Sequence, residues 1–274
     1  MTRVVTLMEN TPGGAGCAFE HGLSFYIETE RHRILSDTGA SAAFADNAAK
    51  LGVELDTVDA VFLSHGHYDH TGGVLAFAAR NPAAPIYLQR GAERPYYALD
   101  RDGAHYIGMN PEIFALPQLR FLDGDAVIDD ELGVISRITG RRHWPSSNRR
   151  LVRKDAAGFV QDSFDHEQAL AVRQSGKYYL FSGCAHNGIL NVLDRFREAY
   201  GRDPDAVFSG FHFMKRGAYT PEEVADIQDT ARELSQMDTV FYSGHCTSQP
   251  ALELMRDIMG EQLRELHSGL ALSL

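Results

Sequence analysis

Residues 58–75 read VDAVFLSHGHYDHTGGVL, and this stretch decides the fold that we expect. It begins as a short apolar run rich in β-branched and aromatic residues, which is typical of a buried strand. The run stops at Ser64, and four potential metal ligands follow within six residues, namely His65, His67, Asp69 and His70. Packing alone does not explain such a cluster at a strand end, so the stretch predicts a metal site.

The chemistry of this turn can be derived from its residue types. Imidazole and carboxylate groups are ligands for zinc, iron and manganese. Because His65 and His67 leave the strand at alternate positions, both side chains can enter one cavity and chelate one ion. Asp69 and His70 would then face a neighbouring position, so that two ions could hold a bridging water that is acidified to hydroxide. A histidine-rich surface loop is the alternative interpretation.

The pattern H-x-H-x-D-H, with an apolar strand before it and T-G-G after it, resembles the metallo-β-lactamase superfamily of metal-dependent hydrolases. Two later motifs, G-C-A-H at residues 183–186 and G-F-H at residues 210–212, make the chain similar to the branch of the dihydropterin ribofuranosylaminobenzene phosphate synthase-like proteins. The resemblance implies an α/β fold, a four-layered αββα sandwich. We expect one domain over residues 1–274, with an insertion over the active site at about residues 90–160.

Composition limits the possible partners and compartments. The formal net charge of -11 argues against nucleic acid as a partner, because an acidic surface repels a phosphate backbone. The cysteines are three in number, Cys17, Cys184 and Cys246, which favours a reducing compartment over a secreted disulfide framework. No stretch reaches membrane-spanning length, so we expect a cytoplasmic enzyme without a membrane partner. The oligomeric state is not predicted.

The order of elements fits a sheet sandwich with helices outside it. The sequence predicts strands at residues 3–8, 23–28, 32–35, 58–63, 85–88, 134–139, 178–182, 206–209 and 239–242. It predicts helices at residues 40–51, 74–80, 189–200, 221–237 and 250–267.

The second half of the chain must supply the remaining ligands. The strand at 178–182 ends in G-C-A-H, and the resemblance implies a ligand at this place, with His186 favoured and Cys184 either a soft ligand or a buried thiol. The chain lacks the G-H-T-x-G histidine of many superfamily members. Asp165 and His166 lie near that place and are alternatives to His186 as third ligand of the first ion.

Further roles are predicted for His245, His212, Asp69 and Asp37. His245 follows the strand at 239–242, where the resemblance implies the last ligand of the second ion. His212 is predicted as a substrate-facing proton donor or charge stabiliser, with a structural histidine as the alternative. Asp69 is predicted to act in catalysis as well as in metal binding. Asp37 is expected either to orient a ligand histidine or to cap the next helix.

The irregular region 90–160 is expected to choose the substrate. It contains a basic stretch, GRRHWPSSNRRLVRK at residues 140–154, in an otherwise acidic chain. Arg141 and Arg142 are predicted to bind an anionic substrate, a carboxylate, sulfate or phosphate, with Trp144 as a stacking wall. A solvated loop or a subunit contact is the alternative.

Together these features predict a hydrolase that acts on an anionic small molecule such as an ester, lactone or phosphodiester. It would use two ions, zinc in the first place, with iron or manganese as alternatives. From the resemblance alone, a transferase similar to the pterin ribofuranosylaminobenzene phosphate synthases is a second hypothesis. A metal-binding redox or sensor protein, with Cys184 and Cys246 beside iron, is a third.

Overall fold

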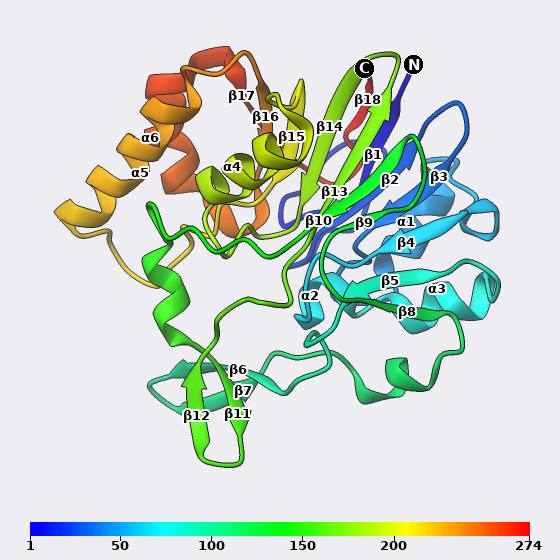
Figure 1. Cartoon of the computed structure of the whole chain (residues 1–274), viewed down its shortest axis with the longest axis horizontal. Helices are drawn as coiled ribbons and strands as arrows, with labels where there is room; N and C mark the ends of the chain where they lie inside the picture. The colour runs from blue at the N-terminus through cyan, green and yellow to red at the C-terminus, as the bar shows by residue number, and fades with distance from the viewer.

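The computed structural model describes residues 1–274 and contains two seven-stranded sheets packed face to face, with helices on both outer faces (Figure 1). The first sheet has the order β18-β1-β2-β3-β4-β5-β8. Its strands are β1 (Arg3–Met8), β2 (Ser24–Glu28), β3 (Arg33–Ser36), β4 (Ala60–Phe62), β5 (Ile86–Gln89), β8 (Leu119–Leu122) and β18 (Ala271–Ser273). The expected four-layered αββα sandwich is confirmed.

The second sheet has the order β17-β16-β15-β14-β13-β10-β9. Its strands are β9 (Ala126–Val127), β10 (Leu132–Ile135), β13 (Ala169–Gln174), β14 (Lys177–Ser182), β15 (Ala206–Ser209), β16 (Val240–Ser243) and β17 (Leu263–Glu265). In this sheet β14, β15, β16 and β17 are mutually parallel, as are β3, β4, β5 and β8 in the first. Each main sheet therefore presents several strand ends along one edge.

Six α-helices accompany the strands. They are α1 (Ala43–Lys50), α2 (Tyr68–Thr71), α3 (Val74–Arg80), α4 (Ile189–Tyr200), α5 (Pro221–Leu234) and α6 (Gln249–Met259). Helices α1 and α3 cover the outer face of the first sheet, and α4, α5 and α6 cover that of the second. Helix α5 begins with a capping box between Thr220 and Glu223, as the sequence pattern favours. None of the helices has the length and apolar character needed to cross a bilayer.

The alternation of side chains along β4 explains the layering. Because successive residues of a strand point to opposite faces, Phe62 enters the core between the two sheets, while Val61 and Leu63 pack against the helices. Phe181 and Phe208 of the second sheet lie in the same inter-sheet core as Phe62. Both faces of the strand are thus buried, which accounts for its continuous apolar run.

A third, four-stranded sheet stands apart from the sandwich, in the lower part of Figure 1. Its order is β12-β11-β6-β7, and we call it the cap sheet. It is built from two hairpins, β6 (Tyr96–Asp100) with β7 (Gly103–Tyr106) and β11 (Leu151–Asp155) with β12 (Gly158–Gln161). The pairing of β6 with β11 joins the hairpins, and a small core forms around Ala98, Leu151 and Phe164. These four strands lie in the irregular region or at its end, and the sequence analysis predicted none of the four.

Two predicted elements are wrong in part. The helix expected at 250–267 ends at Met259, because Gly260 adopts a left-handed φ of 56°, and the chain then enters β17 beside β16. The strand expected at 134–139 is β10, which stops at Ile135 shortly before Arg137 takes a φ of 54°. In both places a change of backbone handedness ends an element whose apolar pattern continues.

We expect Phe62→Ala to lower the free energy of unfolding by about 3–5 kcal/mol, because the substitution leaves a cavity between the sheets. Denaturant unfolding followed by circular dichroism measures this value. Val127→Ala is the control, since Val127 is 88% exposed, and its effect should stay within about 0.5 kcal/mol. Equal effects of the two variants would contradict the layered core described here.

Candidate metal centre

The predicted ligands come from strand ends in both main sheets. In the first sheet β4 leads into the loop with His65 and His67, and α2 follows with Asp69 and His70. In the second sheet β14, β15 and β16 run parallel, so the residues after them gather at one edge. Those residues are Cys184, His186, His212 and His245.

The first group consists of His65, His67 and His186, all buried. Nε2 of His65 lies 3.0 Å from Nδ1 of His67 and 3.2 Å from Nε2 of His186. Zinc–nitrogen bonds of about 2.0–2.1 Å place two nitrogens on one tetrahedral ion roughly 3.3 Å apart. The spacing of the first group therefore suits three ligands of a single ion.

The second group consists of Asp69, His70, Cys184 and His245. Nε2 of His70 lies 3.2 Å from Nε2 of His245 and 3.2 Å from Sγ of Cys184. Oδ2 of Asp69 is 3.3 Å from Nε2 of His245 and 3.7 Å from Nε2 of His70. Nitrogen, oxygen and sulfur donors thus face one another in a buried position next to the first group.

Hydrogen bonds on the opposite side of the rings fix their orientation. His70 Nδ1 donates to Asp37 Oδ2 at 2.7 Å, and His245 Nδ1 donates to Asn10 Oδ1 at 2.8 Å. His186 Nδ1 donates in the same way to Asn148 Oδ1 at 3.0 Å. The Ser64 hydroxyl donates to Asp37, so it accepts from His65 Nδ1 at 2.9 Å. With the proton on Nδ1, each of these rings turns a lone pair at Nε2 toward its group.

These donor sets fit divalent cations. Two Nε2 lone pairs that face each other at about 3 Å repel unless a positive charge lies between them. Burial lowers the pKa of His67 and of His245 to about 4, so both rings are neutral at pH 7, which is the state that binds metal. Burial raises the pKa of the Cys184 thiol, so that group is protonated until a cation displaces the proton.

Two buried glutamates hold the backbone that carries ligands. Glu167 accepts from the backbone N–H groups of His186 and Asn187, at 2.6 Å and 3.0 Å. Glu9 accepts from the backbone N–H of His245 at 2.5 Å. No sequence pattern points to Glu9, which is far from His245 along the chain. Glu167 lies next to the predicted His166, but its role depends on a contact that no local pattern reveals.

The two alternative ligands of the first ion lie elsewhere. Asp165 is outside both groups, because its carboxylate pairs with Arg94 at 2.9 Å on the surface. His166 accepts at Nδ1 from the backbone N–H of Gly66, and its Nε2 donates to Asp162 Oδ2 at 3.2 Å. Both of its nitrogens are therefore engaged in supporting the loop. His186 is the histidine that the structure brings into the first group.

Asp37 lies against the metal loop and not at the start of α1. Its carboxylate contacts Ser64 and His70, and the first residue of α1 is Ala43. Of the two expected roles, orientation of a ligand histidine is the one that the contacts match.

His21 lies at the mouth of the site. Its Nδ1 accepts from the side-chain amide of Asn10, so its Nε2 donates to Asp69 Oδ2 at 3.2 Å. Its ring stacks on His245 with the centroids 4.8 Å apart. Because His21 follows a loop and not a strand, its position gave no periodic signal.

A pocket of about 100 Å³ opens onto both groups. His212 lies on its wall, with its ring centroid 4.1 Å from that of His186 and with no partner on either ring nitrogen. The cap sheet supplies Ala98 and Leu151 to the wall, and the segment after β7 supplies Ile107. Arg150, from the predicted basic stretch, also lines the pocket.

The three residues predicted to bind substrate do not line this pocket. Arg141 donates to the carbonyl of Gly140 and to Asn187 Oδ1, and Arg142 pairs with Asp194 and Glu233. Trp144 packs against the core of the cap sheet. A substrate-binding role for Arg141, Arg142 and Trp144 therefore stays a prediction.

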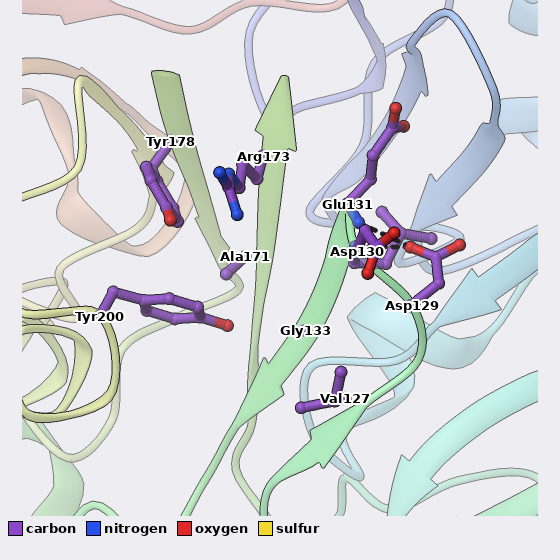
Figure 2. Close-up of a pocket in the computed structure, with 10 residues that line it drawn as sticks. Val127, Asp129, Asp130, Glu131, Gly133, Ala171, Arg173, Tyr178 and Tyr200 are labelled. Carbon is purple, nitrogen blue, oxygen red and sulfur yellow. Dashed lines mark hydrogen bonds between the residues drawn. The ribbon is translucent and has the colours of Figure 1, made fainter. Parts of the chain in front are cut away.

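A second, larger hollow of about 250 Å³ lies on the second sheet, and residues of β9, β10, β13, β14 and α4 line it (Figure 2). Asp129, Asp130 and Glu131 border it on one side and Arg173, Tyr178 and Tyr200 on the other (Figure 2). It contains no predicted site residue, and Asp129 already pairs with His32 at 2.7 Å. Although it is the larger cavity, the smaller pocket is the one that meets the ligand groups.

Comparisons with known proteins agree with this geometry. Residues 18–148 match the family model of the metallo-beta-lactamase superfamily. The chain is 24% identical to the 7,8-dihydropterin-6-methyl-4-(beta-D-ribofuranosyl)-aminobenzene-5'-phosphate synthase of Methanocaldococcus jannaschii, over 97% of this chain and 95% of that protein. It is 29% identical to the hydroxyacylglutathione hydrolase of Aeromonas hydrophila, over 36% of this chain and 40% of that protein.

A solved structure is similar over the whole chain. The crystal structure of Tm1679, a metal-dependent hydrolase of the beta-lactamase superfamily, superposes with a TM-score of 0.82 at 25% sequence identity. The alignment covers 100% of this chain and 99% of that one. The two main sheets and the cap sheet are thus included in the similarity.

We expect Asp37→Asn to weaken metal binding about 10- to 100-fold, because the amide no longer anchors His70 as a carboxylate does. Competition with a chromophoric chelator measures the affinity for zinc, and elemental analysis gives the stoichiometry. Asp165→Asn removes the same charge at the surface and should leave the affinity unchanged. Equal affinities in the two variants would contradict an orienting role for Asp37.

Proposed function

Because this chain belongs to the metallo-beta-lactamase superfamily, we propose that it is a metal-dependent hydrolase of a small anionic molecule, such as an ester, lactone or phosphodiester. The observation that supports this most is the pair of adjacent ligand groups, with hydrogen bonds that turn Nε2 lone pairs inward. The first group would hold one ion, and the second group the other. The small pocket favours a small reacting group over a macromolecule.

The metals supply the chemistry that side chains lack. When bound, two divalent cations such as zinc polarise a carbonyl or phosphoryl oxygen and lower the pKa of a water molecule. Cys184 adds a soft donor to the second group, which favours zinc or iron over manganese.

The chain itself supplies hydrogen bonds around the reacting atoms. His212 is buried on the pocket wall, and its free ring N–H is placed to donate to a substrate oxygen on which negative charge develops. Asp69 also lines the pocket, and its Oδ2 is placed to accept a hydrogen bond from the attacking water. His21 keeps this carboxylate in position by donating to the same oxygen.

A transferase related to the dihydropterin synthase is the second candidate. The similarity to the Methanocaldococcus jannaschii protein over 97% of this chain favours it. The name of that synthase describes a product with a pterin and a phosphorylated ribosyl arene. A pocket of about 100 Å³ would have to enlarge to hold two ring systems, so we place the hydrolase first.

The test is elemental analysis of the purified protein together with a turnover screen on nitrophenyl esters, lactones and phosphodiesters. We expect close to two ions per chain and turnover of one substrate class. Dialysis against a chelator should abolish turnover, and zinc should restore it. Turnover of none of these substrates by the fully loaded protein would contradict the hydrolase and leave the transferase to be assayed directly.

We expect His67→Ala to reduce turnover by about 10³-fold or more and to lower the bound metal, since it removes a ligand of the first group. Circular dichroism should show an unchanged fold, because the loop lies at the edge of a packed sandwich. His105→Ala is the matched control, as His105 is exposed on the cap sheet. Normal turnover by His67→Ala would exclude the proposed mechanism.

A further inference from the structure

One arginine of the basic stretch lines the pocket. Arg150 is the last residue of the short 3₁₀ helix η3 (Ser146–Arg150), directly before β11. His212, His67 and His186 line the same pocket. Arg150 therefore belongs to the same cavity as the ligand groups.

An aspartate of the cap sheet holds this guanidinium. Arg150 Nη1 donates to Asp100 Oδ1 at 3.0 Å, and Arg216 pairs with the other oxygen, Oδ2, at 3.3 Å. The Asp100 side chain is only 12% exposed, whereas that of Arg150 is 38% exposed. One carboxylate is thus shared by two guanidinium groups, of which that of Arg150 lines the pocket.

The guanidinium keeps donors for a ligand. Arginine has five side-chain N–H donors. The bond to Asp100 is the one hydrogen bond that the Arg150 guanidinium makes within the chain. Such a planar group binds a carboxylate or a phosphate through two parallel bonds. Two other arginines of the stretch differ, because Arg142 is paired with carboxylates on α4 and α5, and Arg149 is exposed outside the pocket.

The neighbouring wall is apolar. Ala98, Ile107 and Leu151 line the pocket together with Arg150, and Met214 adds a further apolar side chain. A ligand that fits this lining carries a negative group on an apolar body, and it presents a second group to the metal ligands.

We propose that Arg150 binds an anionic group of the substrate, a carboxylate or phosphate separate from the bond that is cleaved, and that Asp100 positions Arg150. The inference rests on the proposed hydrolase function and specifies its substrate class. Arg150 is thus a substrate-binding residue, and Asp100 acts through it.

The test compares two esters with the same scissile acetyl bond in the zinc-loaded, full-length protein. One is 4-acetoxybenzoate, which carries a remote carboxylate, and the other is its neutral methyl ester. We expect Arg150→Gln to raise the KM for 4-acetoxybenzoate about 10- to 100-fold, because charge-assisted hydrogen bonds are lost. The KM for the methyl ester and the zinc content should not change.

Three further variants separate binding from structure. Arg149→Gln removes the same charge from the adjacent exposed residue and should change neither KM. Arg150→Lys should restore part of the affinity, since it keeps the charge without the planar fork. Asp100→Asn should raise the KM for 4-acetoxybenzoate and not that for the methyl ester. An equal rise for both esters in Arg150→Gln, or no rise in either, would overturn the proposal.

A binding measurement keeps the result independent of turnover. Calorimetry with terephthalate, 4-phosphonobenzoate and benzoate compares a remote carboxylate, a remote phosphonate and no remote anion. We expect Arg150→Gln to weaken the binding of terephthalate or of 4-phosphonobenzoate about tenfold or more and to leave the binding of benzoate unchanged. Whichever of these two ligands the wild-type protein binds more tightly identifies the preferred anion. If neither ester is hydrolysed but this difference is observed, the hydrolase function fails while the anion site stands. Equal binding of all three by the wild type and Arg150→Gln would refute the anion site.

Discussion

The carboxylate of Asp37 joins the segments on which both ligand groups depend. Its Oδ1 accepts from the Ser64 backbone N–H at 2.7 Å, and its Oδ2 accepts from the Ser64 hydroxyl and from His70 Nδ1, each at 2.7 Å. A carboxylate shielded from water requires such partners. The end of β3, the end of β4 and helix α2 are therefore locked together. Asp37 itself adopts a φ of 61°, a strained conformation that these three hydrogen bonds offset.

The sequence was informative wherever a ligand directly follows a strand. An apolar run that ends in histidines needs no distant contact to be recognised, so His65, His67, His186 and His245 could be predicted, and the structure brings them together. The sandwich could be predicted for the same reason, because the alternation of strands and helices is a local pattern. The geometry also separates the alternatives for the third ligand of the first group. Both ring nitrogens of His166 form hydrogen bonds, to Gly66 and to Asp162. The carboxylate of Asp165 forms an ion pair with Arg94.

The supporting residues could not be predicted, because their roles arise from contacts across the chain. Asn10 and Asn148 orient His245 and His186, yet neither is near its partner in the sequence. The basic stretch at residues 140–154 is a second case in which the sequence alone does not reveal the contacts of individual residues. Its composition predicts an anion site, but only the fold decides which guanidinium faces the pocket, and the structure places Arg150 there. The cap sheet was not predicted because its strands are short and no residue of β7 or β12 is buried, so that the region lacks a strong apolar alternation.

The separation between the cap sheet and the sandwich has an evolutionary consequence. The candidate metal ligands follow strand ends of the two main sheets, while the two hairpins of the cap sheet contribute Ala98 and Leu151 to the wall of the pocket. Substitutions at Ala98 or Leu151 can reshape that wall without replacing a candidate ligand. Descendants of one ancestral protein can then diversify in the molecules they accept while their catalytic apparatus is inherited intact.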